Sequence, residues 1–152
     1  MNFQQKTKTD TNGLIPPYGG ELKNLIIKDK NLKNDLISKA TYEFECSERN
    51  ACDVELLMVG AFSPLEGFMD ENNYKSVIKN NRDTNGLLFG LPIVFDSNNE
   101  KVKAGETILL TYKKQKIAVL EVSSKWEPDK SLEAELCYGT NSLDHPAVKM
   151  IF

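Results

Sequence analysis

The sequence has 152 residues, of which 40% are hydrophobic and 27% are charged, and its formal net charge is −3. A chain of this size buries about two-thirds of the surface that its unfolded form exposes, so it builds one core without disulfides or metals. The mildly negative charge gives no overall positive field to attract nucleic acid or an anionic membrane, and no apolar run approaches the roughly 20 residues of a membrane span.

The N-terminal part of the chain changes from polar to turn-rich. Residues 1–13 are polar and show no hydrophobic periodicity, which predicts a mobile tail. They resemble neither a signal peptide nor a transit peptide, so we expect a cytoplasmic protein. Two prolines and two glycines in residues 14–20 predict an ordered turn instead of a strand. The polar run 28–31 interrupts the apolar positions of residues 22–37, which predicts a turn or hairpin-like piece followed by a short helix or strand.

The three cysteines are Cys46, Cys52 and Cys137, and they contain no C-x-x-C pair. An odd count without that spacing argues against a disulfide framework and against a four-ligand zinc site. We therefore expect reduced thiols.

The middle of the chain carries clear start and stop signals. Residues 41–46 alternate between apolar and polar side chains, which is typical of a half-buried strand. Ser47 predicts the N-cap of a helix that Gly60 ends by adopting a left-handed backbone angle. A second helix is expected to begin near Asp70 and to end at residues 80–81, with an inner face formed by Tyr74, Val77 and Ile78.

The following segment changes to the period of strands. Residues 83–86 have turn chemistry, and residues 87–95 are almost continuously apolar. Because Pro92 cannot donate to a ladder, this apolar run predicts a strand that is bulged or lies at a sheet edge. Residues 107–112 and 116–123 also predict strands.

Two further helices are expected near the end of the chain. Pro128 suits the first turn of a helix that Gly139 ends. The inner face of that helix is predicted to carry Leu132, Leu136 and Cys137. Asp144 is a candidate cap for a last helix with Pro146 in its first turn, and residues 147–152 are apolar enough to begin a buried helix that is interrupted in mid-element.

Six short motifs occur in order with plausible gaps: IPPYGG at 15–20, DVELLMVGAFSPLEGFM at 53–69, GLPIV at 90–94, WEPDK at 126–130, YGT at 138–140 and HP at 145–146. Together they resemble the N-terminal domain of ATP sulfurylase (sulfate adenylyltransferase). Tyr18 stands where many relatives carry histidine, and Ala147 stands where glycine is usual.

The resemblance implies an α+β or mainly β fold over residues 14–152, a PUA-like pseudo-barrel of mixed strands with flanking helices. In that family a Rossmann-like catalytic domain follows, with a Gln-x-Arg-Asn segment and a His-x-x-His pair that hold sulfate and the phosphates of ATP. The family reaction uses ATP with Mg²⁺ and sulfate, and it forms adenosine 5′-phosphosulfate and pyrophosphate.

This sequence lacks the parts that such chemistry needs. Sulfate is a poor nucleophile, and its attack on a phosphoryl group concentrates negative charge, so cationic donors have to be preorganised there. The chain has one histidine, its arginines Arg49 and Arg82 lie outside any Gln-x-Arg-Asn context, and no G-x-x-x-x-G-K-[ST] loop occurs. We therefore expect no catalytic, cofactor-binding or metal residues in this chain.

The expected role is a scaffold for a C-terminal catalytic domain that this chain does not contain, in an enzyme that forms a homo-oligomer. This hypothesis predicts an exposed apolar patch around Phe62, Phe68 and residues 150–152, where the catalytic domain would dock. The alternative is a stand-alone PUA-like module that binds RNA, against which the acidic balance argues.

Individual candidates each have a structural alternative. His145 is either a base or ligand or part of a helix start, and Ser63 is either a nucleophile or a turn-making residue outside any G-x-S-x-G context. Residues 83–86 resemble the opening of a calcium loop but lack its final glutamate. Trp126 either pins a loop against the core or offers a stacking platform. A basic turn that binds an anion or RNA, or that is simply solvated, is formed by Lys113, Lys114 and Lys116.

Overall fold

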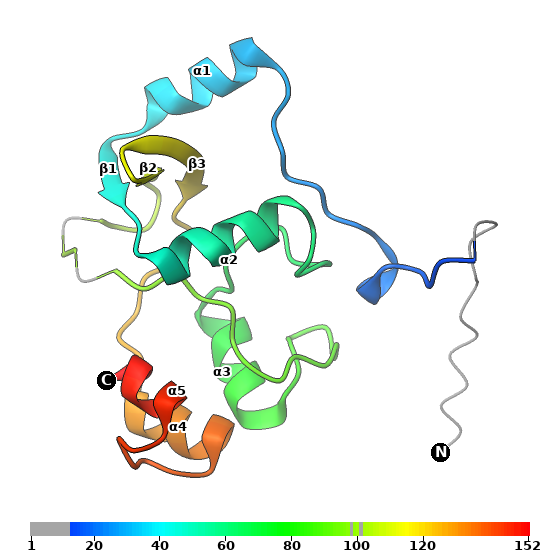
Figure 1. Cartoon of the computed structure of the whole chain (residues 1–152), viewed down its shortest axis with the longest axis vertical. Helices are drawn as coiled ribbons and strands as arrows, with labels where there is room; N and C mark the ends of the chain where they lie inside the picture. The colour runs from blue at the N-terminus through cyan, green and yellow to red at the C-terminus, as the bar shows by residue number, and fades with distance from the viewer. Residues whose placement is uncertain (1–12, 98, 101) are drawn as a thin grey trace.

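The computed structural model describes residues 13–97, 99–100 and 102–152 (Figure 1). The predicted tail over residues 1–13 lies, apart from Gly13, outside the described residues. In chain order the elements are η1 (Tyr18–Gly20), α1 (Lys30–Lys39), β1 (Tyr42–Glu45), α2 (Glu48–Met58), α3 (Glu71–Asn80), β2 (Thr107–Tyr112), β3 (Gln115–Glu121), α4 (Lys130–Tyr138) and α5 (Pro146–Ile151).

The three strands form one mixed sheet in the order β1-β2-β3. β1 runs parallel to β2, with Phe44 opposite Leu110, and β2 runs antiparallel to β3, with Leu110 opposite Ala118. The long connection from β1 to β2 contains α2 and α3, as a parallel pair requires. The mixed sheet and its flanking helices confirm the predicted α+β fold with mixed strands.

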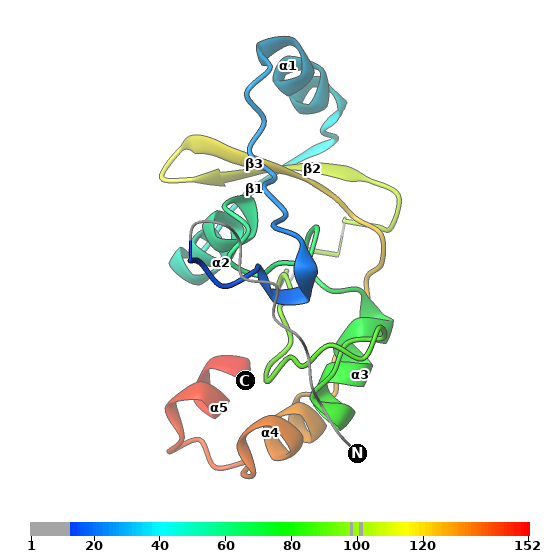
Figure 2. The same cartoon turned by 90° about the vertical axis from the view of Figure 1, so that its right-hand side faces the viewer.

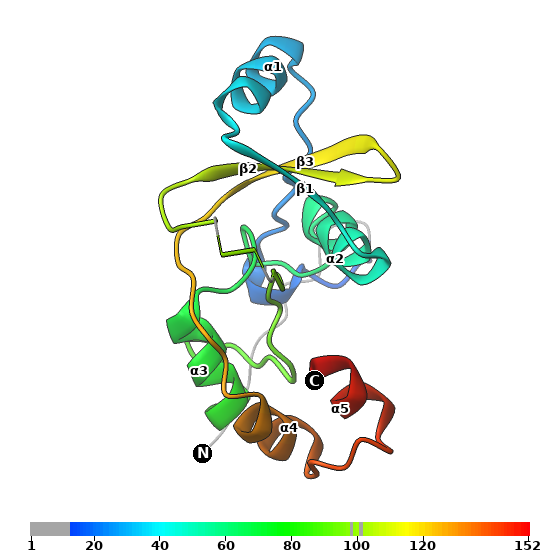
Figure 3. The same ribbon diagram turned by 90° about the vertical axis from the view of Figure 1, so that its left-hand side faces the viewer.

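The core lies between the sheet and α2. Cys46, Ala51, Val54, Val102, Ile108 and Leu110 form its buried cluster. Figures 2 and 3 show the sheet edge-on, with α1 on one side and α2 on the other, while α3, α4 and α5 lie farther from the sheet. None of the side chains of α1 is buried, so this helix adds little to the core.

Most local start and stop signals are confirmed. The Ser47 hydroxyl accepts the backbone N–H of Asn50 at 3.1 Å, and the Asp70 carboxylate accepts that of Asn73 at 2.8 Å. Gly60 and Gly139 follow α2 and α4 with φ angles of +80° and +69°, which a glycine adopts without strain.

The strand predicted over residues 87–95 is wrong. Within this segment the structure has a single bridge, from Leu88 to Arg82. The segment instead bonds to neighbouring loops, because the Phe89 N–H donates to the Asn81 carbonyl at 2.9 Å and the Ile93 carbonyl accepts the Met69 N–H at 2.8 Å. A segment whose backbone partners are irregular loops has no strand alongside it to form a ladder.

One helix start was not predicted, and the predicted starts of two other helices need correction. Asp29, inside the polar run expected to interrupt the segment, caps α1 by accepting the N–H of Leu32 at 3.0 Å. Asp129, instead of Pro128, begins α4 by accepting the Leu132 N–H at 3.0 Å. His145 occupies the N-cap position of α5, where Asp144 was expected.

The predicted inner face of α4 and the expectation that the last helix is buried also need correction. Ala134 is the buried residue of α4, whereas Leu136 is exposed. In α5, Val148 is fully buried while Met150 is exposed, and Phe152, directly after the helix, is exposed as well. Residues separated by less than a turn point to different sides, so a short helix with mostly apolar residues does not reveal its inner face from sequence.

Candidate functional site

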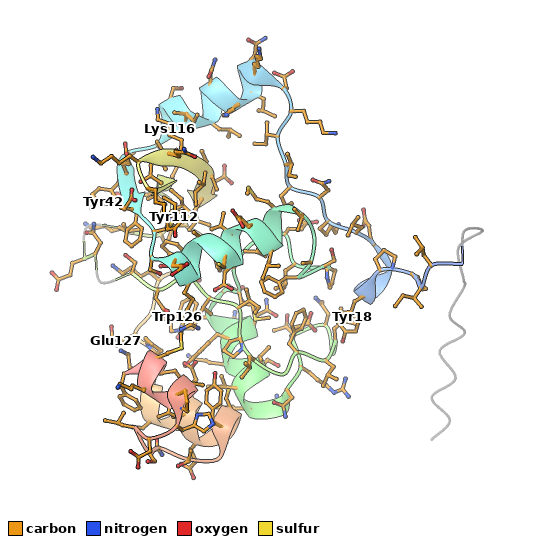
Figure 4. The ribbon with its side chains drawn as sticks, viewed as in Figure 1. Tyr18, Tyr42, Tyr112, Lys116, Trp126 and Glu127 are labelled. Carbon is orange, nitrogen blue, oxygen red and sulfur yellow. The ribbon has the colours of Figure 1, made fainter. Side chains whose placement is uncertain are left out.

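The first sequence motif, which contains Tyr18 (labelled in Figure 4), lies against the second motif and against the segment just before the third. The Tyr18 hydroxyl donates a 2.8 Å hydrogen bond to the Leu88 carbonyl. A Cβ added to Gly19 would lie 2.7 Å from Cγ of Pro64, so only glycine permits this approach. The N-terminal turn is therefore built to fit the loop that follows α2.

Ser63 lies at the centre of this contact and is buried. Its hydroxyl donates to the Gly60 carbonyl at 2.6 Å and accepts the Lys23 N–H at 3.0 Å. With its proton and an acceptor position both engaged in backbone hydrogen bonds, the hydroxyl stabilises the turn. The geometry supports the structural alternative for Ser63 and gives no support to a nucleophile.

A small ion-pair group lies at the edge of the same contact. The Lys23 ammonium lies 2.9 Å from Glu21 and 2.8 Å from Glu66. The hydrogen bond from Lys23 lowers the pKa of the Glu66 carboxyl, and the Glu66 and Glu21 carboxylates raise the pKa of Lys23. Because its two acidic neighbours already bind this cation, it is a poor candidate for an anion site.

A second cluster surrounds Trp126, the only tryptophan in the sequence. The rings of Tyr74 and Trp126 are 5.5 Å apart, and the Tyr74 hydroxyl donates to the Glu133 carboxylate at 2.8 Å. Burial raises the pKa of Glu133, and burial together with Glu133 raises the pKa of Tyr74. Nearby, the rings of Tyr138 and His145 are 5.4 Å apart.

The ring contact with Tyr74 supports the packing interpretation of Trp126, and the N-cap position of His145 supports its role in a helix start. In the described part of the chain, the indole N–H of Trp126 and Nδ1 of His145 are buried without a hydrogen-bond partner. Sequence analysis missed Glu133, because a glutamate on a short helix carries no sign that it will pair with a tyrosine 59 residues away.

The Asp83 segment and the basic pair Lys113–Lys114 both form turns. The Asp83 carboxylate accepts the backbone N–H groups of Asn85 and Leu87 at 2.9 and 2.7 Å, which makes residues 83–86 a turn. Lys113 and Lys114 form the two-residue turn between β2 and β3, with φ angles of 49° and 63°.

The arginines and cysteines do not assemble a reactive site. Arg49 lies 4.0 Å from Asp96, and Arg82 donates to the Gly86 carbonyl, so both guanidinium groups face local partners. Burial raises the pKa of the Cys46 thiol to about 11, which keeps it protonated at neutral pH. The three cysteines are free thiols.

The described residues offer neither a metal site nor a membrane span. Among residues 13–97, 99–100 and 102–152, no three His, Cys, Asp or Glu side chains come together to hold a metal ion. None of the helices that the structure describes is long and apolar enough to cross a membrane.

The family model for the PUA-like domain matches residues 15–152. The sulfate adenylyltransferase of Neurospora crassa is 41% identical over 146 residues, a match that covers 90% of this chain and 25% of that protein. The one of Schizosaccharomyces pombe is 40% identical over 139 residues, with 86% of this chain and 28% of that protein covered. The chain thus spans about a quarter of the length of these relatives.

The solved structure of a hexameric APS kinase from Thiobacillus denitrificans is also similar, with a TM-score of 0.67 and 31% identity. The similarity covers 76% of this chain and 24% of that one. The chain therefore belongs to the PUA-like domain family, and it matches the N-terminal domain of the sulfate adenylyltransferases, which are also called ATP sulfurylases.

Proposed function

We propose that this chain serves as the N-terminal domain of an enzyme that joins sulfate to the α-phosphorus of ATP and releases pyrophosphate. The observation that carries the proposal is the identity of 41% to a sulfate adenylyltransferase over 90% of the chain. All six sequence motifs lie within the range of the family match, so the likeness includes the loops as well as the core.

The domain's own part in this reaction is structural. The reaction brings two anions together, so its site needs several cationic donors aimed at the developing charge. In the described residues Lys23, Arg49 and Arg82 are turned to carboxylates or a carbonyl of the domain itself. We therefore assign ATP, Mg²⁺ and sulfate to the part of the enzyme beyond this domain, and no chemical step to these 152 residues.

The proposed partner is a C-terminal catalytic domain in the same polypeptide, and the relatives, of which the chain spans about a quarter, support it. We also propose a homo-oligomeric enzyme, which the hexameric assembly named for the similar solved structure supports. A cytoplasmic location is proposed as well, since three unpaired cysteines suit a reducing compartment.

The test starts from the reading frame that encodes this chain. The polypeptide that the frame encodes through and beyond Phe152 is expressed and assayed for pyrophosphate release with ATP, Mg²⁺ and sulfate. The proposal expects release that requires sulfate. A polypeptide of the relatives' length that folds but shows no sulfate-dependent release would contradict it.

A further inference from the structure

Large apolar side chains are exposed on the N-terminal segment around η1 and at two positions that contact it or lie beside a residue that does. The side chains of Leu14, Ile15, Tyr18, Leu22, Val59 and Leu88 are each half or more exposed, and Ile15 reaches 84%. We call these six residues the Tyr18 patch. Tyr18 and Leu88 are joined by a hydrogen bond, and Leu22 lies beside Gly60, next to Val59 in the chain.

The N-terminal segment that carries part of this patch is anchored from Tyr18 onward. The Tyr18 hydroxyl bonds to the Leu88 carbonyl, the Lys23 N–H donates to Ser63, and the Leu25 N–H donates to the Met58 carbonyl at 2.9 Å. Pro16 and Pro17 restrict the backbone further. A segment whose backbone is already anchored loses little further backbone entropy when a partner covers its side chains.

The charge distribution resembles that of a protein interface. Residues 13–20 contain no charged side chain, although 27% of the whole sequence is charged. Glu21, Lys23 and Glu66 form the charged group at the edge of this stretch. An apolar centre that contains a tyrosine and has a polar rim is typical of interfaces.

We propose that the Tyr18 patch is the surface on which the remainder of the sulfate adenylyltransferase polypeptide packs. This inference rests on the proposed function. The partner we name is the remainder of the same polypeptide, because the relatives are about four times as long as the region that this chain matches. The family match begins at residue 15, so it includes most of the patch. The two acidic and one basic side chains at the edge favour an apolar partner surface with a neutral or basic rim.

The patch differs from the one predicted from sequence. Phe62 and Phe68 are only partly exposed, and Phe68 packs against the core cluster and lies 5.3 Å from the ring of Phe95. Met150 and Phe152 are exposed as expected. They lie near the C-terminus, which Figure 1 places well away from η1.

Photo-crosslinking tests the inference in the full polypeptide that the reading frame encodes. A benzophenone amino acid replaces Tyr18 in one variant and Leu88 in a second, so that a folding defect at one position leaves the other informative. The matched control carries the same group at Leu143, which is 59% exposed, as Leu88 is 57% exposed, and lies in the loop before α5. After illumination, crosslinked peptides are identified by mass spectrometry.

We expect crosslinks from positions 18 and 88 to peptides outside residues 1–152 in a chain of monomer mass. Their yield should exceed that of position 143 by about tenfold, because a packed interface holds the group against its partner. Products of twice the mass would identify a second copy as the occupant. Such products, crosslinks confined to residues 1–152, or equal yields at all three positions would each overturn the inference.

Pyrophosphate release by the unsubstituted polypeptide separates this inference from the proposed function. Sulfate-dependent release without the expected crosslinks overturns the docking surface and leaves the function standing. The expected crosslinks in an inactive polypeptide leave the docking surface standing and contradict the function.

Discussion

The Tyr74 hydroxyl donates a 2.8 Å hydrogen bond to the Glu133 carboxylate, which joins α3 to α4. Tyr74 is almost wholly buried, and its ring lies 5.5 Å from that of Trp126. This contact links two helices that lie on the far side of α2 from the sheet, where the core cluster does not reach (Figure 2). This hydrogen bond should therefore contribute to the free energy that holds α4 against α3.

Tyr74→Phe removes the donor and leaves a half-buried carboxylate without it. We expect the free energy of unfolding to fall by about 1–3 kcal/mol, as for a lost hydrogen bond to a charged group. Tyr18→Phe is the matched control, because it removes an exposed hydrogen bond to a carbonyl and should cost less than about 1 kcal/mol. Urea unfolding followed by Trp126 fluorescence measures the free energy of unfolding of both variants. An equal loss of stability in Tyr74→Phe and Tyr18→Phe would contradict this account.

Glu133 should make stability depend on pH. Burial raises the pKa of Glu133 in the folded chain above its ordinary value, so folding favours the protonated carboxyl. This contribution to stability is therefore fully present below the ordinary pKa of glutamate and is lost as the pH rises through the raised folded pKa. Glu133→Gln keeps an acceptor for Tyr74 but removes the charge.

The Glu133→Gln variant should accordingly gain stability relative to the unsubstituted chain at pH 7 and lose that advantage at pH 4. The gain is expected to be below about 1 kcal/mol, since the carboxyl is partly exposed and solvent screens it. Unfolding curves at both pH values measure the difference. A variant that is less stable than the parent at pH 7 would show that the charged form is favoured.

Gly60 combines a left-handed backbone with a close contact. Its φ is +80°, and an added Cβ would lie 2.8 Å from Cδ1 of Leu22 and 2.8 Å from the Lys23 carbonyl oxygen. Gly86 has a similar φ of +86° but open space around the added atom. Gly86→Ala should thus cost about 1–2 kcal/mol for the backbone angle alone, and Gly60→Ala should cost clearly more.

Thermal unfolding of the two glycine variants separates the effect of the angle from that of the contact. The melting temperature should fall further for Gly60→Ala than for Gly86→Ala. Similar melting temperatures would mean that residues 22–23 move away from the loop at little cost.

Ser63→Ala tests how the N-terminal segment is attached. The substitution leaves the Lys23 N–H and the Gly60 carbonyl without the hydroxyl that they share. We expect a loss of about 1–3 kcal/mol for a buried group left without its partner and faster proteolysis between residues 14 and 27. Ser123→Ala, at an exposed position, is the control and should change neither measurement.

The sequence was sufficient for elements whose signals are local. Ser47, Asp70 and Gly60 mark helix ends through contacts within a few residues, and each does so in the structure. Residues 87–95 were misread because their apolar composition resembles a strand, while their backbone partners, Asn81 and Met69, belong to loops that composition does not reveal.

The Tyr18 patch and the Tyr74 contact could not be predicted from the sequence for a different reason. Both depend on which residues meet across long separations, such as 70 residues from Tyr18 to Leu88. Phe68 was expected at the surface, but it packs against the core cluster, and its ring lies 5.3 Å from that of Phe95. Whether a large apolar side chain is exposed depends on the packed fold. A sequence motif predicts the local backbone conformation but not this exposure.

The measurement that tests the central claim most directly is pyrophosphate release by the 152-residue chain alone, supplied with ATP, Mg²⁺ and sulfate. Circular dichroism and the fluorescence of Trp126 first establish that the chain is folded. The account predicts release no faster than in a protein-free control, at every sulfate concentration. Sulfate-dependent release that is proportional to the amount of this chain would contradict it.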